Sequence, residues 1–311
     1  MSIQHFTALT DLSSEQLLEI VGRASELKAM LKQGHEHRPL QGKTLAMIFE
    51  LSSTRTRVAF ETGMFQMGGH AIFIDSHSSQ LGRGEPISDS AQVLSRMVDV
   101  VSIRTTDHSK LDEFAAASQV PLINAMSDTL HPCQLLADVQ TYQEHRGSIE
   151  GRQIAFVGDG YNMCNSYINA AELFGFSLRL ACPQGFQPDP QRLAASNNAV
   201  LVDTPQEAVE AADLVVTDVW SSMGHEQDQT RRSRAFQGYQ ITPELLDLAD
   251  QDTLFMHCLP AHEGDEISPG LLNDRRSVAW DEAGNRLHSQ KALLEFLLAK
   301  DRESDAQGSS D

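Results

Sequence analysis

The chain has 311 residues, 41% of them hydrophobic and 22% charged, a mixture typical of a globular protein and unlike that of a disordered or fibrous one. Its 24 basic and 43 acidic residues give a net charge of −19, so we expect no nucleic-acid partner and no anionic membrane partner. The length predicts about two domains at ~100–200 residues each, and no apolar run approaches the ~18 residues that a membrane span needs.

The cysteines and the N-terminus favour a cytoplasmic protein. The cysteines form no C-x-x-C pair, which argues against a disulfide framework and a zinc ribbon and favours reduced thiols. The N-terminus has no basic segment followed by an apolar stretch, so we expect no secretory signal. The four cysteines are Cys133, Cys164, Cys182 and Cys258.

The first half of the chain alternates predicted helices and strands. Ser13 precedes Gln16 by three residues, the spacing of a capping box at a helix start. The apolar run 44–50 has the length of a buried strand, and Ser52-Ser53-Thr54 after it is typical of a helix N-terminus. Further strands are predicted at 71–74, 98–104 and 121–124, and further helices at 111–117 and 135–145.

The second half repeats the pattern. A strand at 154–157 precedes the tight turn Gly158-Asp159-Gly160 and a helix at 165–174, and strands follow at 177–182, 199–202, 214–219 and 253–257. This alternation predicts an α/β fold with two doubly wound parallel-sheet domains. We expect one domain at 1–145 and one at 146–282, a last helix at 283–300 that packs back on the first domain, and a disordered polar tail at 301–311.

Four polar clusters follow predicted strands, where open α/β sheets bind their ligands. In the first, at 53–57, two hydroxyls, free backbone N–H groups and a guanidinium converge on a helix N-terminus, which suits a phosphate group. A helix cap flanked by surface arginines is the alternative. The doubled Thr-Arg after a buried strand favours the phosphate site.

Each of the other three clusters also has a structural alternative. His131 and Gln134 flank a turn and are able to grip a carbonyl and its amine, but a histidine satisfied within the core is the alternative. Asp218 at a strand end suits a cationic amine, or it caps a helix. Cys258, in a His-Cys-Leu-Pro segment, is a candidate nucleophile or ligand contact, against a buried inert thiol.

Taken in order, the four clusters resemble the aspartate/ornithine carbamoyltransferase family. The motifs are S-T-R-T-R at 53–57, H-P-x-Q at 131–134, D-x-x-x-S-M-G at 218–224 and H-C-L-P at 257–260. The last two are similar to those of the ornithine-specific members, whereas aspartate-specific members lack them. The likeness covers essentially the whole chain and implies an active site in the cleft between the two domains.

The resemblance implies that the first domain binds carbamoyl phosphate. The segment 53–56 matches the phosphate-binding residues, Arg104 matches an arginine that reaches both phosphate and carbonyl oxygen, and Gln80 matches a residue lent to a neighbouring subunit. A homotrimer or a multiple of trimers is therefore implied. The implied carbamoyl phosphate contacts are Ser53, Thr54, Arg55, Thr56, Gln80, Arg104, His131, Gln134, Cys258, Leu259 and Arg286.

The second domain is implied to bind L-ornithine, with Asp218 on the α-amino group and Asn162 on the α-carboxylate, together with Ser222 and Met223. The implied reaction is attack of the neutral δ-amine on the carbamoyl carbon, which gives L-citrulline and phosphate in arginine metabolism, with biosynthesis favoured. The departing phosphate is able to take the amine proton, so no protein base is obligatory, and neither a metal nor an organic cofactor is expected. The implied catalytic residues are Thr56, Arg104, His131 and Cys258.

Two segments depart from the family pattern. Leu51 stands where members often carry Lys, which removes one cation near the phosphate and predicts a lower affinity for carbamoyl phosphate. Residues 82–86 read Gly-Arg-Gly-Glu-Pro where Gly-His-Lys-Glu-Ser is frequent, so one cation is kept and the histidine is lost.

Three other functions stay open. A carbamoyltransferase for another amine, such as N-acetylornithine or putrescine, fits the first two motifs. Leu51 motivates a catalytically impaired paralogue that serves as a subunit or scaffold. Val157-Gly158-Asp159-Gly160 suggests a dinucleotide-binding dehydrogenase, but Met163 stands where the third glycine of that motif belongs.

Overall fold

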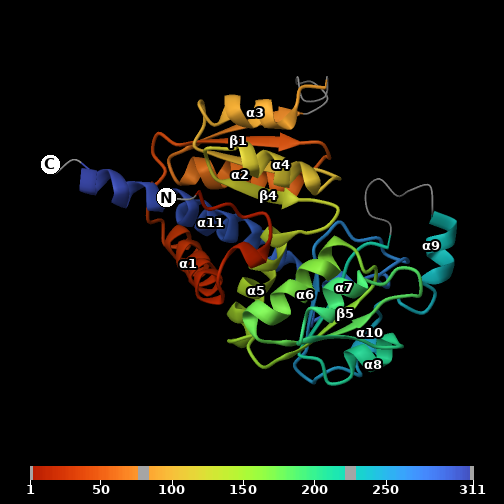
Figure 1. Cartoon of the computed structure of the whole chain (residues 1–311). Coiled ribbons are helices and arrows are strands. Elements are labelled where there is room, and N and C mark those ends of the chain that lie inside the picture. Colours follow the sequence, from red (N-terminus) through yellow and green to blue (C-terminus); the bar gives the residue numbers. More distant parts are fainter. Residues whose placement is uncertain (1–2, 76–83, 221–228, 309–311) are drawn as a thin grey trace. The chain divides into compact units, whose positions relative to one another are not determined.

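The computed structural model describes residues 3–75, 84–220 and 229–308 (Figure 1). The chain forms two compact units, one made of Met1–Gln140 with Asn285–Asp311 and the other of Thr141–Gly284. Each unit contains one parallel sheet with helices in its strand connections, which confirms the predicted α/β class. Within the described ranges, no helix has both the length and the apolar character that crossing a membrane requires.

Unit 1 is built on a four-stranded parallel sheet in the order β2-β1-β3-β4. The inner strands β1 (Thr44–Phe49) and β3 (Val100–Arg104) are almost wholly buried, as parallel strands covered on both faces are. The outer strands are β2 (His70–Asp75), which is partly exposed, and β4 (Leu122–Met126). The helices that contribute to this unit are α1 (Ser14–Lys32), α2 (Thr54–Gln66), α3 (Ile87–Leu94), α4 (Ser109–Ala117), the start of α5 (Pro132–Arg146) and most of α11 (Ala279–Gly308).

Local capping signals in the sequence set the starts of α1 and α2 in unit 1. Ser13 Oγ accepts the backbone N–H of Gln16 at 3.2 Å, and Gln16 Oε1 accepts that of Ser13 at 3.0 Å, so the predicted capping box is confirmed. Helix α3 has no counterpart among the expected elements, because Pro86 rather than a polar cap precedes it. Its position is set by packing, since Ala91 shares a core cluster with Phe114 of α4.

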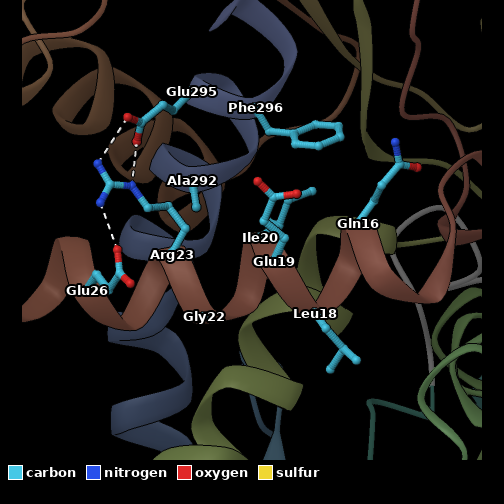
Figure 2. A pocket seen from close by; sticks show the side chains of 10 residues that line it. All are labelled: Gln16, Leu18, Glu19, Ile20, Gly22, Arg23, Glu26, Ala292, Glu295 and Phe296. Atoms are coloured by element: carbon cyan, nitrogen blue, oxygen red, sulfur yellow. Dashed lines mark hydrogen bonds and ion pairs between the residues drawn. The ribbon is translucent and has the colours of Figure 1, made fainter. Parts of the chain in front are cut away.

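The last helix contacts unit 1 through both polar and apolar residues. Arg23 of α1 forms ion pairs with Glu26 at 2.8 Å and with Glu295 of α11 at 3.1 Å (Figure 2). Leu293 and Leu297 of α11 are buried. The helix runs to Gly308, whereas its composition predicts disorder from residue 301. Arg, Glu, Ala and Gln in that stretch are good helix formers, which explains why the backbone continues in the same conformation.

Unit 2 is built on a five-stranded parallel sheet in the order β7-β6-β5-β8-β9. Its core cluster joins the central strands to α8 and α10 and includes Val157, Val215 and Phe255. The strands are β5 (Gln153–Val157), β6 (Ser177–Ala181), β7 (Ala199–Leu201), β8 (Leu214–Thr217) and β9 (Leu254–His257). The helices are α6 (Asn162–Phe174), α7 (Pro190–Ala194), α8 (Pro205–Val209), α9 (Gln229–Ala235) and α10 (Pro243–Leu246).

Each sheet reverses its strand order at one place. In unit 1 the chain goes from β1 outward to β2 and then returns to the other side of β1 as β3. In unit 2 it goes from β5 through β6 to β7 and returns beside β5 as β8. Ligands of open α/β sheets bind outside the carboxyl ends of the strands at such switch points. The topology therefore predicts one ligand-binding place at β1/β3 and another at β5/β8.

The turn after β5 is shaped by close backbone packing. A Cβ atom added to Gly160 would lie 2.3 Å from the backbone nitrogen of Pro188 and 2.7 Å from the carbonyl oxygen of Phe186. The Gly160 N–H donates to that same oxygen at 2.8 Å. The glycine is thus explained by contact with the chain after β6, and a dinucleotide pyrophosphate is not needed to account for it.

We predict that Gly160→Ala lowers the free energy of unfolding by about 1–3 kcal/mol, because backbone atoms must move to admit the methyl group. Gly22, an exposed glycine in α1 with nothing within 4 Å of an added Cβ, is the matched control. Gly22→Ala should raise the free energy of unfolding by up to about 1 kcal/mol through helix propensity. Urea unfolding measures both, and equal effects at the two positions would contradict the packing argument.

Candidate active site

The first candidate half-site lies at the β1/β3 switch point of unit 1. Ser53 caps α2, and its Oγ accepts the backbone N–H of Thr56 at 3.3 Å. Thr54 is exposed and Arg55 is half-buried, so the first turn of α2 presents a hydroxyl, a guanidinium and the positive end of the helix dipole. The predicted helix start at this motif is confirmed, and its chemistry suits a bound phosphate.

The second arginine of the same motif has a different environment. Arg57 donates from Nε to Glu61 at 2.8 Å, and its guanidinium lies 3.8 Å from the ring centre of Phe73. These contacts fix Arg57 on the outer side of α2. The doubling of Thr-Arg, which favoured a phosphate site in the sequence, therefore reflects two arginines with separate environments.

Arg286 joins three distant segments of unit 1. Its side chain is buried, with 3% of the residue exposed, and Nη2 donates to Thr56 Oγ1 at 3.1 Å. Nη1 donates to Gln134 Oε1 at 2.5 Å, and Gln134 Nε2 donates in turn to Asp138 Oδ1 at 2.8 Å. The last helix thus brings a guanidinium to the first turn of α2 and to the start of α5.

Arg104 and His131 complete this half-site. Arg104 is the last residue of β3 and pairs with Phe49 of β1, which places it at the switch point. Burial lowers the pKa of His131 well below its usual range. The guanidinium charges of Arg286, Arg104 and Arg55 lower this pKa further, so the imidazole is neutral at physiological pH. A neutral ring among cations is able to donate one hydrogen bond and accept another.

Glu50 connects the two strands of this switch point and was not among the expected site residues. Its backbone N–H donates to the carbonyl oxygen of Arg104 at 2.9 Å, and its carboxylate accepts the Thr105 hydroxyl at 2.6 Å. Lys110 forms an ion pair with the same carboxylate at 2.6 Å. These contacts hold the chain before Ser53 against the chain after Arg104.

The second candidate half-site lies in unit 2, where β8 and β9 end. The Cys258 thiol donates to Asp218 Oδ1 at 3.1 Å, and the backbone N–H of Val219 donates to the same oxygen at 2.7 Å. Burial raises the pKa of Asp218, while these donors partly oppose that rise. A carboxylate whose charge is poorly solvated is suited to pairing with a substrate cation.

His257 sets the backbone beside Cys258. Its Nδ1 accepts the N–H of Leu259 at 2.9 Å, so the ring proton lies on Nε2, which donates to Glu266 at 3.1 Å. His257 and Glu266 are both fully buried. Leu259 has a φ of +56°, a left-handed conformation that costs a branched residue energy, and the hydrogen bond to His257 holds it there.

Asp218, His257 and Cys258 also have the composition of a cation site, since one donor atom from each lies within 4.8 Å of the others. However, both ring nitrogens of His257 are engaged with Leu259 and Glu266, and the thiol is engaged with Asp218. These three residues are thus explained by hydrogen bonds within unit 2. The expectation that the reaction needs no metal stays a prediction.

Asn162 is the first residue of α6 and is buried, at the β5/β8 switch point of the same unit. The sequence placed this helix start three residues later, because Tyr161, which precedes Asn162, is not a capping residue. The structure begins the helix without a side-chain cap, after Tyr161. Gln80, Ser222 and Met223 lie outside the described residues.

The comparisons with known proteins agree with this arrangement. The family model "Aspartate/ornithine carbamoyltransferase, carbamoyl-P binding domain" matches residues 4–144, and the model "Aspartate/ornithine carbamoyltransferase, Asp/Orn binding domain" matches residues 150–297. The chain belongs to the aspartate/ornithine carbamoyltransferase family. The first matched region contains the residues of the first half-site except Arg286, which lies in the second matched region together with the residues of the second half-site.

Relatives within this family carry ornithine carbamoyltransferase names. The protein of that name from Psychrobacter cryohalolentis is 58% identical over 96% of this chain and 98% of its own length. "Ornithine carbamoyltransferase 1, anabolic" from Pseudomonas savastanoi pv. phaseolicola is also 58% identical, with the same coverage. The solved ornithine carbamoyltransferase of Pyrococcus furiosus has a TM-score of 0.90 and 42% identity, over 95% of this chain and 97% of that one.

We predict a pH effect on stability from His131. Below about pH 6.5 the unfolded chain binds a proton on this histidine and the folded chain does not, so the free energy of unfolding falls by up to about 1.4 kcal/mol per pH unit. His131→Gln removes this loss, so the stability difference between the two proteins should change as the pH falls from about 7.5 to about 5. Urea unfolding measures it, with His35→Gln, at an exposed histidine, as the control. If the free energies of unfolding of wild type and His131→Gln depended on pH in the same way, the prediction would be contradicted.

Proposed function

We propose that the protein transfers the carbamoyl group of carbamoyl phosphate to the δ-amine of L-ornithine, giving L-citrulline and phosphate. The observation that carries the proposal is a set of three arginines: Arg55 in the first turn of α2, Arg104 at the end of β3 and Arg286, which bonds to Thr56 and Gln134. All three charges lower the pKa of His131. Such a cluster is suited to a small dianion that also has a carbonyl group. The ornithine carbamoyltransferase names of the relatives, one of them anabolic, support ornithine as acceptor and biosynthesis as direction.

The carbamoyl phosphate half uses charge and helix geometry. In this proposal the phosphate lies at the N-terminus of α2, where Ser53, Thr54 and Arg55 provide hydroxyl, amide and guanidinium donors. Arg104, His131 and Thr56 donate to the carbonyl oxygen as it gains negative charge. Arg286 and Gln134 keep these groups in register through the hydrogen bonds described above. The local cations offset a net charge of −19.

The ornithine half uses a carboxylate and an amide. Asp218 pairs with the α-ammonium group, which restores the charged form that burial disfavours. Asn162 donates to the α-carboxylate, and the chain around Cys258 and Leu259 lies beside the reacting nitrogen. The Cys258 thiol donates a hydrogen bond to Asp218 and so keeps its proton. We therefore propose that Cys258 contacts the substrates and does not act as a nucleophile.

The reaction needs the uncharged δ-amine, since a free alkylamine has a pKa near ~10.4 and is mostly protonated at neutral pH. Its lone pair attacks the carbamoyl carbon, the carbonyl oxygen takes the negative charge, and the C–O bond to phosphate then breaks. The departing phosphate accepts the amine proton, so no side chain has to act as the base. Loss of one donor to the developing oxyanion should cost about 10²–10³-fold in rate.

An assay for citrulline tests the proposal, with Arg55→Ala and Arg57→Ala as a matched pair on one helix. Arg55→Ala should lower kcat/KM at least about 10²-fold, because it removes a cation from the phosphate. Arg57→Ala should stay within about threefold of wild type, because an exposed ion pair contributes little.

Three acceptors should be compared in the same assay. N-acetylornithine lacks the cation that pairs with Asp218, and putrescine lacks the α-carboxylate that pairs with Asn162, so both should react more slowly than ornithine. Faster turnover of N-acetylornithine or putrescine would identify that amine as the acceptor in place of ornithine. If the pure wild-type protein formed no citrulline, the proposal would be refuted.

We further propose that the protein works as a homotrimer or a multiple of trimers in the cytoplasm. Phe65 of α2 is 78% exposed, and Val58 of the same helix and Ile72 of the outer strand β2 are also exposed apolar side chains of unit 1. Apolar side chains exposed on neighbouring elements are typical of a protein interface. The four free cysteines fit a reducing compartment.

Light scattering of the wild-type protein should give three times the 34.3 kDa mass of one chain, or a multiple of that value. Phe65→Asp should lower this mass and reduce citrulline formation, because a charge cannot be buried without a partner. Leu18→Asp, at an exposed leucine of α1, is the control and should leave the mass unchanged. A wild-type monomer with full activity would contradict the trimer.

A further inference from the structure

A buried ion pair at the β5/β8 switch point has no part in the chemistry described so far. Arg232 of α9 donates from Nη1 to the carboxylate of Asp159 and to the carbonyl oxygen of Trp220, the latter at 2.6 Å. The exposed fractions of the two charged side chains are 11% and 9%. A charge pair so well covered is costly to bury and strongly destabilising to break on one side only.

An aromatic cluster lies beside the guanidinium. Arg232 lies 4.8 Å from the ring centre of Phe186, and Phe186 packs against Phe236 at 5.0 Å. Trp220 also stacks on Phe236, with their ring centres 5.3 Å apart. The rings shield the ion pair from water and restrict the guanidinium to one orientation.

The two partners of Arg232 belong to the two segments that carry the proposed ornithine contacts. Asp159 lies in the turn after β5, three residues before Asn162 at the start of α6. Trp220 follows β8, two residues after Asp218. The guanidinium group of Arg232 therefore connects the segment that leads to the Asn162 amide with the segment that contains the Asp218 carboxylate.

We propose that Arg232 is a positioning residue that fixes Asn162 and Asp218 at the spacing needed to hold the α-carboxylate and α-amino groups of ornithine. The proposal rests on the ornithine contacts assigned under the proposed function. Arg232 touches neither the substrate nor the reacting atoms in this assignment, and it acts by holding the two segments together. Loss of Arg232 should weaken binding of the α-carboxylate and α-amino groups of ornithine and leave binding of carbamoyl phosphate unchanged.

Steady-state kinetics of Arg232→Gln test the proposal. The KM for ornithine should rise at least about tenfold, the scale of one lost charge-assisted hydrogen bond, while the KM for carbamoyl phosphate stays within about twofold. L-norvaline has the α-groups of ornithine but no δ-amine, so its inhibition constant should rise by the same factor as the KM for ornithine.

Two further variants separate positioning from a general loss of structure. Arg232→Lys keeps the charge and should recover part of the ornithine KM, and Asp159→Asn combined with Arg232→Gln should be no worse than Arg232→Gln alone. Arg234→Gln, at an exposed arginine of the same helix, should match wild type. If Arg232→Gln does not fold, the Lys variant alone decides through its ornithine KM and norvaline inhibition.

An unchanged ornithine KM in Arg232→Gln, or equal rises for both substrates, would overturn the proposal. If Arg232→Gln does not fold, an ornithine KM of the Lys variant equal to that of wild type would do so. These results are read only with a wild-type protein that makes citrulline. Absence of citrulline from the wild type would instead refute the proposed function.

Discussion

The guanidinium of Arg286 is the group on which the first half-site depends. It lies on the last helix and donates hydrogen bonds to Thr56 on α2 and to Gln134 on α5. Because it is buried, removal of either partner would leave a charge with too few acceptors. The same charge helps to keep His131 neutral. One side chain thus fixes the geometry of the half-site and sets the protonation state of its histidine.

The two units apply the same solution at their switch points. At both switch points, where open α/β sheets bind their ligands, a charged side chain connects the segments that follow the two neighbouring strands. In unit 1 the carboxylate of Glu50 connects the ends of β1 and β3. In unit 2 the guanidinium of Arg232 connects the segments after β5 and β8. The connecting charge of Arg232 has the same sign as the α-ammonium group that we assign to Asp218, and the connecting charge of Glu50 is opposite in sign to that of Lys110, with which it pairs.

Much of the fold could be predicted from the sequence because its signals are local. The buried strands are short apolar runs, and Ser13 and Ser53 are capping residues whose partners lie three residues away. Short α3 could not be predicted, because it begins at Pro86 without a polar cap and is held by packing on α4. The early start of α6 at Asn162 could not be predicted either, because Tyr161 before it provides no side-chain cap.

The candidate site could be predicted only where a motif is contiguous. The motifs around Arg55, His131 and Cys258 are visible as sequence, and Arg286 was placed by resemblance alone. Glu50 and Lys110 are 60 residues apart, and Asp159 and Arg232 are 73 apart. Neither pair has a local pattern, since both are brought together by the order of strands in a sheet. Charged pairs across a switch point are therefore invisible to periodicity and spacing.

The place of Arg286 near the end of the chain has a consequence for biosynthesis on the ribosome. Strands β1 to β4 and the motif at α2 are synthesised before α11, so Lys28 bonds to Asn285, and Thr56 to Arg286, only after the start of α11 has been made. A nascent chain interrupted before α11 carries the α2 motif without the cation that completes it. A shortened product of this kind therefore lacks the guanidinium that bonds to Thr56 and Gln134, and its first half-site stays incomplete.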